Sequence, residues 1–234
     1  AVLRRIAPEG PEAGRLTRAL AVLGGPSPLR QAAALAGLDL PAAARLADRL
    51  RAADVLAPGS VLEFAHPIVR TAVYESIPPG ERALAHAEAA RLLEREGAHA
   101  ERLALHLLRS EPGADPRVAA LLRAAATAAT GRGDPGDAAA CLRRALDEPP
   151  PAADRPGLLL ELGIALARER SPAAVPALRE AVELAGPDAA LLAARVLGIW
   201  AYHAEAAAIC RNALAGAVPD DLADSLQAEL FQNA

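Results

Sequence analysis

The chain has 234 residues, of which 53% are hydrophobic and 2% aromatic, and its formal net charge at pH 7 is −4. This length can bury a substantial core, and the apolar content excludes a disordered chain. Every basic side chain is arginine. Without lysine, these residues can form neither a P-loop nor a Schiff-base site. The sequence also has no Gly-x-Ser-x-Gly, Cys-x-x-Cys or His-Glu-x-x-His motif, and we expect a protein that is not an enzyme.

Cysteine usage and hydropathy give expectations about location. Cys141 and Cys210 are too few for a disulfide framework, and we expect both to pack as small apolar residues in the core. No apolar run reaches the length of a membrane span, and the residues after Arg4 and Arg5 do not resemble a leader peptide. We therefore expect a cytoplasmic protein that does not contact a membrane.

The first 79 residues combine helical and β patterns. Leucines at helical spacing, followed by Gly or Pro, predict helices over 13–24, 28–37 and 41–54. The stretch VLAPGSVLEF (55–64) is typical of two short β segments around a turn, and a helical run then begins at the His66-Pro67 pair. Because three helices followed by a hairpin is the winged-helix order, we predict a winged-helix-like domain over residues 1–79.

Only helical patterns follow residue 80, and they come in pairs broken by Gly, Pro or Asp. The predicted pairs are 80–97 with 99–113, 115–133 with 134–150, 155–170 with 171–187, and 188–203 with 204–219.

These pairs repeat along the chain. AAACLRRAL (138–146) aligns with AVPALREAV (174–182), 36 residues later, and with AAAICRNAL (206–214), a further 32 residues on. The spacing is close to the ~34-residue tetratricopeptide period. Small residues such as Ala138, Ala174 and Gly163 would let paired helices approach closely. We predict a tetratricopeptide-like array over residues 80–234, and hence a mostly α fold in which an α-solenoid follows the winged-helix-like domain.

One segment resembles a known family. FAHPIVRTAVYESIPPGERALAHAEAARLL (64–93) is similar to the F-x-H-P-L-V-R-x-A-V-Y segment of large ATP-binding LuxR-type regulators, members of the STAND class of signalling ATPases. Residues 123–150 resemble that family's first helical repeat, LLLELGIAL (158–166) also fits, and the resemblance extends over about residues 3–220.

The resemblance implies a domain order. In that family a P-loop ATPase precedes a winged-helix domain, and a tetratricopeptide-like sensor array and a DNA-binding helix-turn-helix follow. Because neither end is among these residues, the chain would be the central segment of such a parent protein, with the parent's own ATPase and DNA-binding domains as its partners. No cofactor is expected for the segment alone, whereas the parent would use ATP and ADP.

The resemblance also implies a nucleotide contact in the parent protein. His66 matches the position of a winged-helix histidine that, in related STAND proteins, reaches the β-phosphate of bound ADP. Arg70, one turn later, would contact phosphate or the ATPase domain. The alternative is structural: His66 would cap or satisfy the backbone at the junction before the helix, and Arg70 would form a surface ion pair or pack its stem along the helix.

The predicted array offers a surface for an effector, either a protein or a small molecule. Stacked helical pairs form extended grooves, and Arg123, Arg168, Trp200 and Tyr202 are candidate lining residues. Trp200 is either an anchor for the partner or a core residue. We also considered a homodimer formed through the C-terminal end of the array.

Two further site classes are disfavoured by the sequence. His99 and His106 share a helical face, but no third donor completes a metal site. The helix over 41–54 carries arginines that its aspartates interrupt, so we expect no direct nucleic-acid binding.

The sequence-based hypothesis is thus a non-catalytic regulatory segment that binds an effector and couples it to an ATPase. The alternatives are a free-standing tetratricopeptide-like interaction scaffold and a small DNA-binding repressor.

Overall fold

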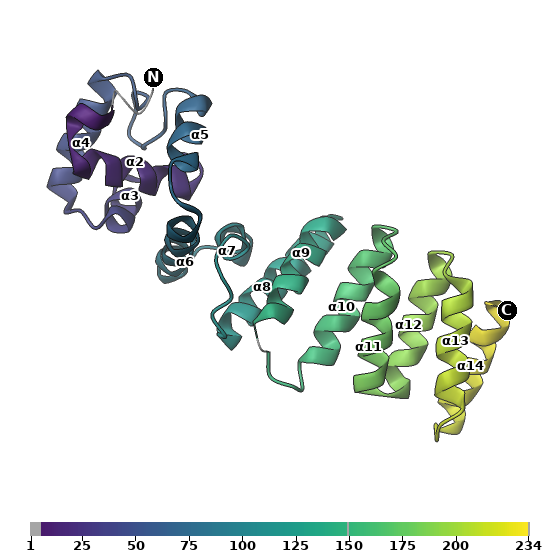
Figure 1. Cartoon of the computed structure of the whole chain (residues 1–234). Coiled ribbons are helices and arrows are strands. Elements are labelled where there is room, and N and C mark those ends of the chain that lie inside the picture. Colours follow the sequence, from purple (N-terminus) through teal and green to yellow (C-terminus); the bar gives the residue numbers. More distant parts are fainter. Residues whose placement is uncertain (1–5, 149, 234) are drawn as a thin grey trace. The chain divides into compact units, whose positions relative to one another are not determined.

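The computed structural model describes residues 6–148 and 150–233, and Figure 1 shows its elements. The described residues form thirteen α-helices and one 3-10 helix, with no strand among them, so the expectation of a mostly α fold is confirmed. The chain divides into two compact units between residues 111 and 112, called unit 1 and unit 2 below.

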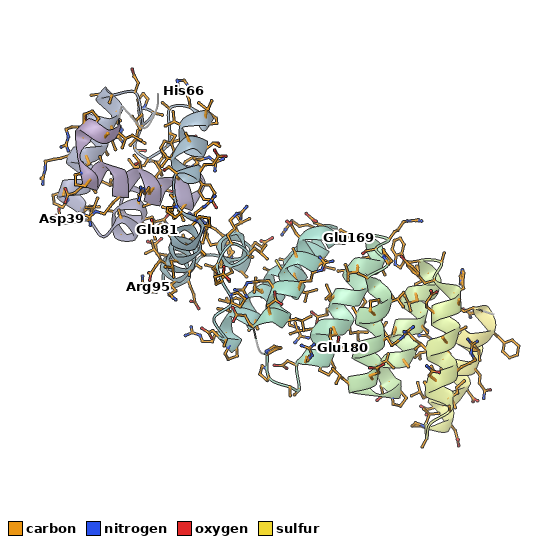
Figure 2. The ribbon with its side chains drawn as sticks, viewed as in Figure 1. Asp39, His66, Glu81, Arg95, Glu169 and Glu180 are labelled. Atoms are coloured by element: carbon orange, nitrogen blue, oxygen red, sulfur yellow. The ribbon has the colours of Figure 1, made fainter. Side chains whose placement is uncertain are left out.

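Unit 1 holds the first seven helical elements. They are η1 (Ala7–Glu9), α2 (Pro11–Leu23), α3 (Leu29–Ala36), α4 (Leu40–Ala52), α5 (Pro67–Glu75), α6 (Pro79–Arg95) and α7 (Ala100–Leu107). Gly24 and Gly37 end α2 and α3 with positive φ angles of 85° and 63°, as C-terminal glycines commonly do. The side chain of Asp39, labelled in Figure 2, accepts a hydrogen bond from the Ala42 amide and so caps α4.

The β segments predicted at 55–64 appear only as isolated antiparallel bridges. Leu56 pairs with Phe64, and Leu62 pairs with Ser27, which lies between α2 and α3. The Ser27–Leu62 pair exchanges two backbone hydrogen bonds of 2.9 and 2.8 Å. Pro58 has no N–H to donate and Gly59 has a φ of 144°, so the pairing does not extend into the turn as regular strands.

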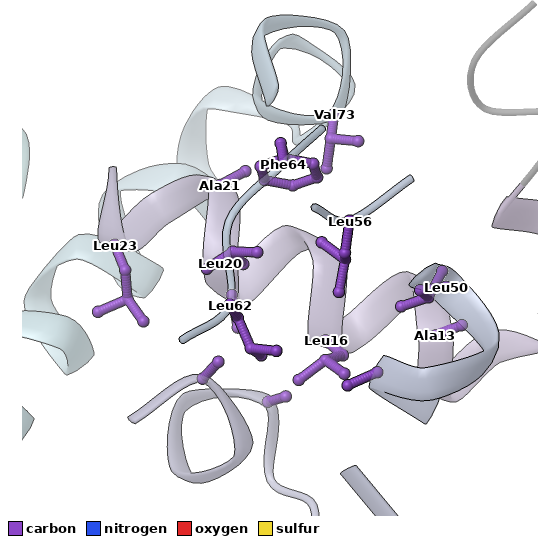
Figure 3. Packing of buried hydrophobic residues seen from close by; sticks show 14 of the residues in the cluster. Ala13, Leu16, Leu20, Ala21, Leu23, Leu50, Leu56, Leu62, Phe64 and Val73 are labelled. Atoms are coloured by element: carbon purple, nitrogen blue, oxygen red, sulfur yellow. The ribbon is translucent and has the colours of Figure 1, made fainter. Parts of the chain in front are cut away.

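A single apolar cluster holds unit 1 together. Leu16 and Leu20 of α2 lie at its centre with Leu50, Leu56 and Leu62, and each is at most 2% exposed. Figure 3 shows Phe64 close to Ala21 of α2 and Val73 of α5, so the bridged segment fills the space between these two helices.

The division between units differs from the boundary expected at residues 79 and 80. Helix α6 packs on α2 and α3 as well as on α7. Ala89 of α6 is fully buried in the unit 1 cluster, and Glu96 pairs with Arg30 of α3. The helical pair α6–α7 therefore belongs to unit 1, because its apolar face is buried there.

Unit 2 contains seven helices that follow one another as repeat-like layers. They are α8 (Pro116–Gly131), α9 (Pro135–Asp147), α10 (Arg155–Arg168), α11 (Ala174–Ala185), α12 (Pro187–Ile199), α13 (His203–Leu214) and α14 (Asp220–Gln232). Each helix packs on the next wherever a short turn joins them, and α14, which the sequence analysis did not include, packs on both α12 and α13. Ala138, Ala174 and Leu178 are fully buried between layers.

Candidate functional site

His66 is the N-cap residue of α5 and has extended backbone angles (φ −140°, ψ 139°). Its side chain is exposed, makes no capping hydrogen bond, and has no hydrogen-bond partner among the described residues. Pro67 follows at the first position of the helix, where its fixed φ favours helix initiation. The capping role that we considered for the His66 side chain is therefore not seen in the structure, and Figure 2 shows the residue at the outer end of α5.

Arg70 lies one turn further along α5 and is also exposed. Its Nη1 donates to the carbonyl oxygen of Gly24, 3.5 Å away at the end of α2, and it forms no ion pair among the described residues. The surface ion pair considered for Arg70 is thus absent from the described part of the chain.

Arg70 lines a cavity of unit 1 that has a volume of about 690 Å³. The walls come from the end of α2 and the glycines that follow it, from α5, from α6 and from α7. We call this cavity the arginine cavity because Arg70, Arg102 and Arg109 all line it, whereas Glu75 is the only acidic residue in its wall.

A chain of hydrogen bonds runs along the wall of the arginine cavity. The Tyr74 hydroxyl lies 2.9 Å from His86 Nε2, and His86 Nδ1 lies 2.9 Å from His106 Nδ1. Both imidazoles are buried, with 3% of His86 and 4% of His106 exposed. Helices α5, α6 and α7 each contribute one of the three side chains, so these hydrogen bonds link the three helices.

This arrangement allows two proton patterns in which both rings are neutral. In one, the Tyr74 hydroxyl donates to His86 Nε2, and His86 Nδ1–H donates to His106 Nδ1, which leaves the proton of His106 on Nε2. In the other, His106 Nδ1–H donates to His86 Nδ1, and His86 Nε2–H donates to the Tyr74 oxygen. A direct Nδ1···Nδ1 hydrogen bond needs one proton and one lone pair, so protonation of both rings would break it.

The surroundings keep both histidines neutral. Burial lowers the pKa of His86 to about 4, and the positive charges of Arg109 and Arg82 act in the same direction. Burial likewise lowers the pKa of His106 to about 4, aided by His86, Arg109 and Arg102. Arg82 also stacks on Tyr74, with its Cζ 4.9 Å from the ring centroid.

This histidine pair was not among the sites predicted from the sequence. His86 lies eleven residues before Gly97 and His106 nine residues after it, and Gly97 is the turn between α6 and α7. Residues at similar distances from the turn of a helical hairpin lie opposite each other, so this spacing could have predicted the pair. His99, which we had grouped with His106, is the exposed N-cap residue of α7.

In unit 2 the four predicted partner-binding residues have different surroundings. Arg123 of α8 forms a bidentate ion pair with Glu161 of α10, with Nη2 2.6 Å from Oε1 and Nε 3.0 Å from it. This hydrogen bond raises the pKa of the Arg123 guanidinium. Arg168 is exposed in the last turn of α10.

Trp200 and Tyr202 lie in the turn between α12 and α13, and both are half-buried. The guanidinium carbon of Arg170 lies 5.7 Å from the centroid of the Trp200 ring, a cation–π contact. Trp200 is thus neither fully exposed nor a core residue.

Unit 2 also contains a buried ion pair. Glu148 is 1% exposed; its carboxylate accepts hydrogen bonds from the Gly113 and Asp115 amides and from Arg144 Nη1 at 2.8 Å. Burial alone would raise the pKa of Glu148, but the hydrogen bonds from Arg144, Asp115 and Gly113 outweigh it and lower that pKa. The Glu148 carboxylate therefore joins Arg144 at the end of α9 to the backbone that leads into α8.

Other candidate features are structural. Cys141 and Cys210 are buried thiols, as expected, and burial raises the pKa of Cys141 to about 11. On α4, Arg49 pairs with Glu9 and Arg51 pairs with Asp48. Within the described ranges no three His, Cys, Asp or Glu side chains converge as a metal site, and none of the helices described is long and apolar enough to cross a membrane.

Comparison of this chain with protein-family models, with curated proteins and with solved structures gives no match.

Proposed function

We propose that the chain is a non-catalytic regulatory segment of an ATP-dependent, cytoplasmic LuxR-type transcription regulator of the STAND class. In this proposal unit 1 acts as a winged-helix-like coupling domain that contacts the parent's ATPase. Unit 2 acts as a tetratricopeptide-like array that receives a protein or small-molecule effector. The effector then changes the balance between two states of the ATPase, which is a coupling between distinct sites.

The observation that carries this proposal is the state of His66. The residue occupies the F-x-H-P position of the resembled segment, and the start of a helix holds its backbone. Its imidazole is exposed and unused by the described residues, so it can donate to an external group such as the β-phosphate of ADP. His99 is also an exposed N-cap residue without a side-chain capping bond, so the match of His66 to the resembled segment is what separates the two histidines.

The order of elements in unit 1 supports a winged-helix-like domain. Three α-helices, α2, α3 and α4, precede the bridged segment. Ser27 lies between α2 and α3, and its bridge to Leu62 adds a third short extended stretch. Arg49 and Arg51, two of the arginines of α4, already pair with carboxylates. Because these guanidinium groups are engaged, a coupling role is favoured over the reading of DNA bases.

A second candidate function is a free-standing interaction scaffold, and exposed apolar side chains of unit 2 favour it. Ile199 is 76% exposed and Phe231 is 87% exposed, so both are available to another protein. Nucleotide dependence separates the two functions, because a scaffold has no ATPase to regulate.

The gene that encodes these residues provides the test. The proposal predicts, in the same reading frame, an upstream segment with a Gly-x-x-x-x-Gly-Lys-Ser/Thr motif and a downstream helix-turn-helix. A reading frame with neither would support the scaffold. A low-salt gel-shift titration of the 234-residue chain with duplex DNA should show no binding, and salt-dependent binding would favour the repressor alternative.

A further inference from the structure

The wall of the arginine cavity holds three arginines and one carboxylate, that of Glu75, so it carries an excess of positive charge. Each guanidinium has five N–H donors, yet each is seen to use one on an uncharged oxygen. Arg70 donates to the Gly24 carbonyl, Arg102 to the side-chain oxygen of Gln31, and Arg109 to the Leu105 carbonyl. Within the described ranges, none of the three arginines forms an ion pair with a carboxylate.

We propose that the arginine cavity binds the oxyanion group of a small molecule. The planar guanidinium fork matches phosphate, sulfate and carboxylate, and arginines from both α5 and α7 can hold such a group between them. The cavity volume of about 690 Å³ suits a small ligand, and Val22, Leu23 and Leu105 offer apolar surface to the rest of that ligand. Arg70 is shared with the contact that the resemblance implies, but Arg102 and Arg109 are not, so this inference does not depend on the proposed function.

The histidine pair is expected to couple anion binding to proton uptake. His86 and His106 also line the cavity, and a bound anion would favour their protonated forms. The charged groups around the pair are Arg82 of α6, Arg102 of α7, Arg109 in the turn after α7, and Arg70 and Glu75 of α5. The part of α2 in the wall, residues 21–23, has no charged side chain. The cavity is therefore expected to bind an anion more tightly as the pH falls, with proton uptake.

Isothermal titration of the 234-residue chain with sulfate and, separately, with pyrophosphate tests the proposal. Sulfate keeps its charge between pH 4.5 and 8, so any change in its affinity over this range reports the protein. Arg102→Gln and Arg109→Gln are the test variants. Arg45→Gln is the matched control, because Arg45 is an exposed arginine on α4, outside the cavity wall, and forms no ion pair among the described residues.

We expect saturable binding of at least one anion, and tighter binding of sulfate at pH 4.5, close to the pKa values of about 4, than at pH 8. Loss of one charge-assisted contact should weaken binding roughly tenfold in each test variant, whereas Arg45→Gln should leave it unchanged. Circular dichroism checks that each variant is folded, and Arg70→Gln replaces any test variant that is not. Two results would overturn the proposal: no saturable binding of either anion, or equal weakening by Arg45→Gln and the cavity variants.

Discussion

Gly163 of α10 lies directly against the Leu178 side chain of α11. A Cβ added to Gly163 would lie 2.5 Å from Leu178 Cδ2 and 3.3 Å from the Leu178 backbone nitrogen. Such distances are shorter than van der Waals contact, so this pair of helices has room for a glycine alone. This contact gives a steric reason for the small residues that were predicted to let paired helices approach closely.

Gly163→Ala should therefore destabilise unit 2. In an open helix interior, Gly→Ala stabilises by about 1 kcal/mol, whereas overpacking costs about 1–3 kcal/mol. We expect the overpacking to dominate, because a backbone atom as well as the Leu178 side chain stands in the way. Urea denaturation followed by the fluorescence of Trp200, the one tryptophan of the chain, reports unit 2 specifically.

Gly131→Ala is the matched control, since Gly131 ends α8 in the same unit and a Cβ there would meet nothing within 4 Å. The control should be neutral or slightly stabilising. Equal urea midpoints for Gly163→Ala and Gly131→Ala would contradict this prediction, because they would show that α10 and α11 can move apart without loss of stability.

Glu148 should make unit 2 sensitive to acid. Its pKa is lower in the folded state than in the unfolded chain, so its contribution is present above the ordinary glutamate pKa and is lost as the pH falls through the folded value. Glu148→Ala should cost about 3–5 kcal/mol at pH 7, because it leaves Arg144 buried without its partner. It should also weaken the dependence of stability on pH below about 4.5.

Urea denaturation followed by Trp200 fluorescence at pH 7 and pH 3.5 measures both effects. Glu180→Ala is the control: Glu180 pairs with Arg155, but both side chains are more than 40% exposed, so it should cost less than about 1 kcal/mol. An equal loss of stability in both variants at pH 7 would contradict the structural role of Glu148.

The histidine pair should make unit 1 lose stability in a different pH range. Unfolded histidines titrate near pH 6.5, whereas the folded pKa values of His86 and His106 are about 4. The unfolded state therefore binds more protons between these values, and stability falls as the pH falls from about 6.5 to about 4. Each pKa unit corresponds to about 1.4 kcal/mol, so the loss reaches roughly 3 kcal/mol per histidine.

Amide hydrogen exchange of Pro79–Arg95 and Ala100–Leu107, corrected for intrinsic rates, measures this loss. The double variant His86→Gln with His106→Gln should show little dependence on pH in that window. His99→Gln, which changes an exposed histidine of the same unit, should retain the wild-type dependence. The opposite pattern would assign the pH effect to other groups.

The sequence predicted where helices begin and end better than it predicted which helices pack together. Glycines and prolines such as Gly37, Gly97 and Pro116 mark helix ends through backbone geometry alone, so the helix limits were largely correct. The sequence did not show that α6 and α7 would pack in unit 1, because alanine-rich faces such as the one around Ala89 fit many surfaces. The exposure of His66 also depends on tertiary packing, as does the engagement of Arg123 by Glu161.

The His86–His106 pair differs, because its spacing about Gly97 within the predicted helical pair 80–97 with 99–113 was a usable signal. Each histidine alone looks like an ordinary helical residue, and only the antiparallel arrangement of α6 and α7 brings the two Nδ1 atoms to 2.9 Å. The arginines of the cavity come from α5, from α7 and from the turn after α7, and the chain has no lysine, so arginines are common along it. Their convergence therefore had no distinguishing signal in the sequence.

The most direct test of the proposed function is the rate at which ADP leaves the complete gene product. Fluorescent ADP is bound, chased with unlabelled nucleotide, and followed in the wild type, in His66→Ala and in the control His99→Ala. If His66 contacts the phosphate, His66→Ala should speed ADP release roughly tenfold while His99→Ala has no effect. Release at the wild-type rate from His66→Ala, or a gene product that binds no ADP, would contradict the account.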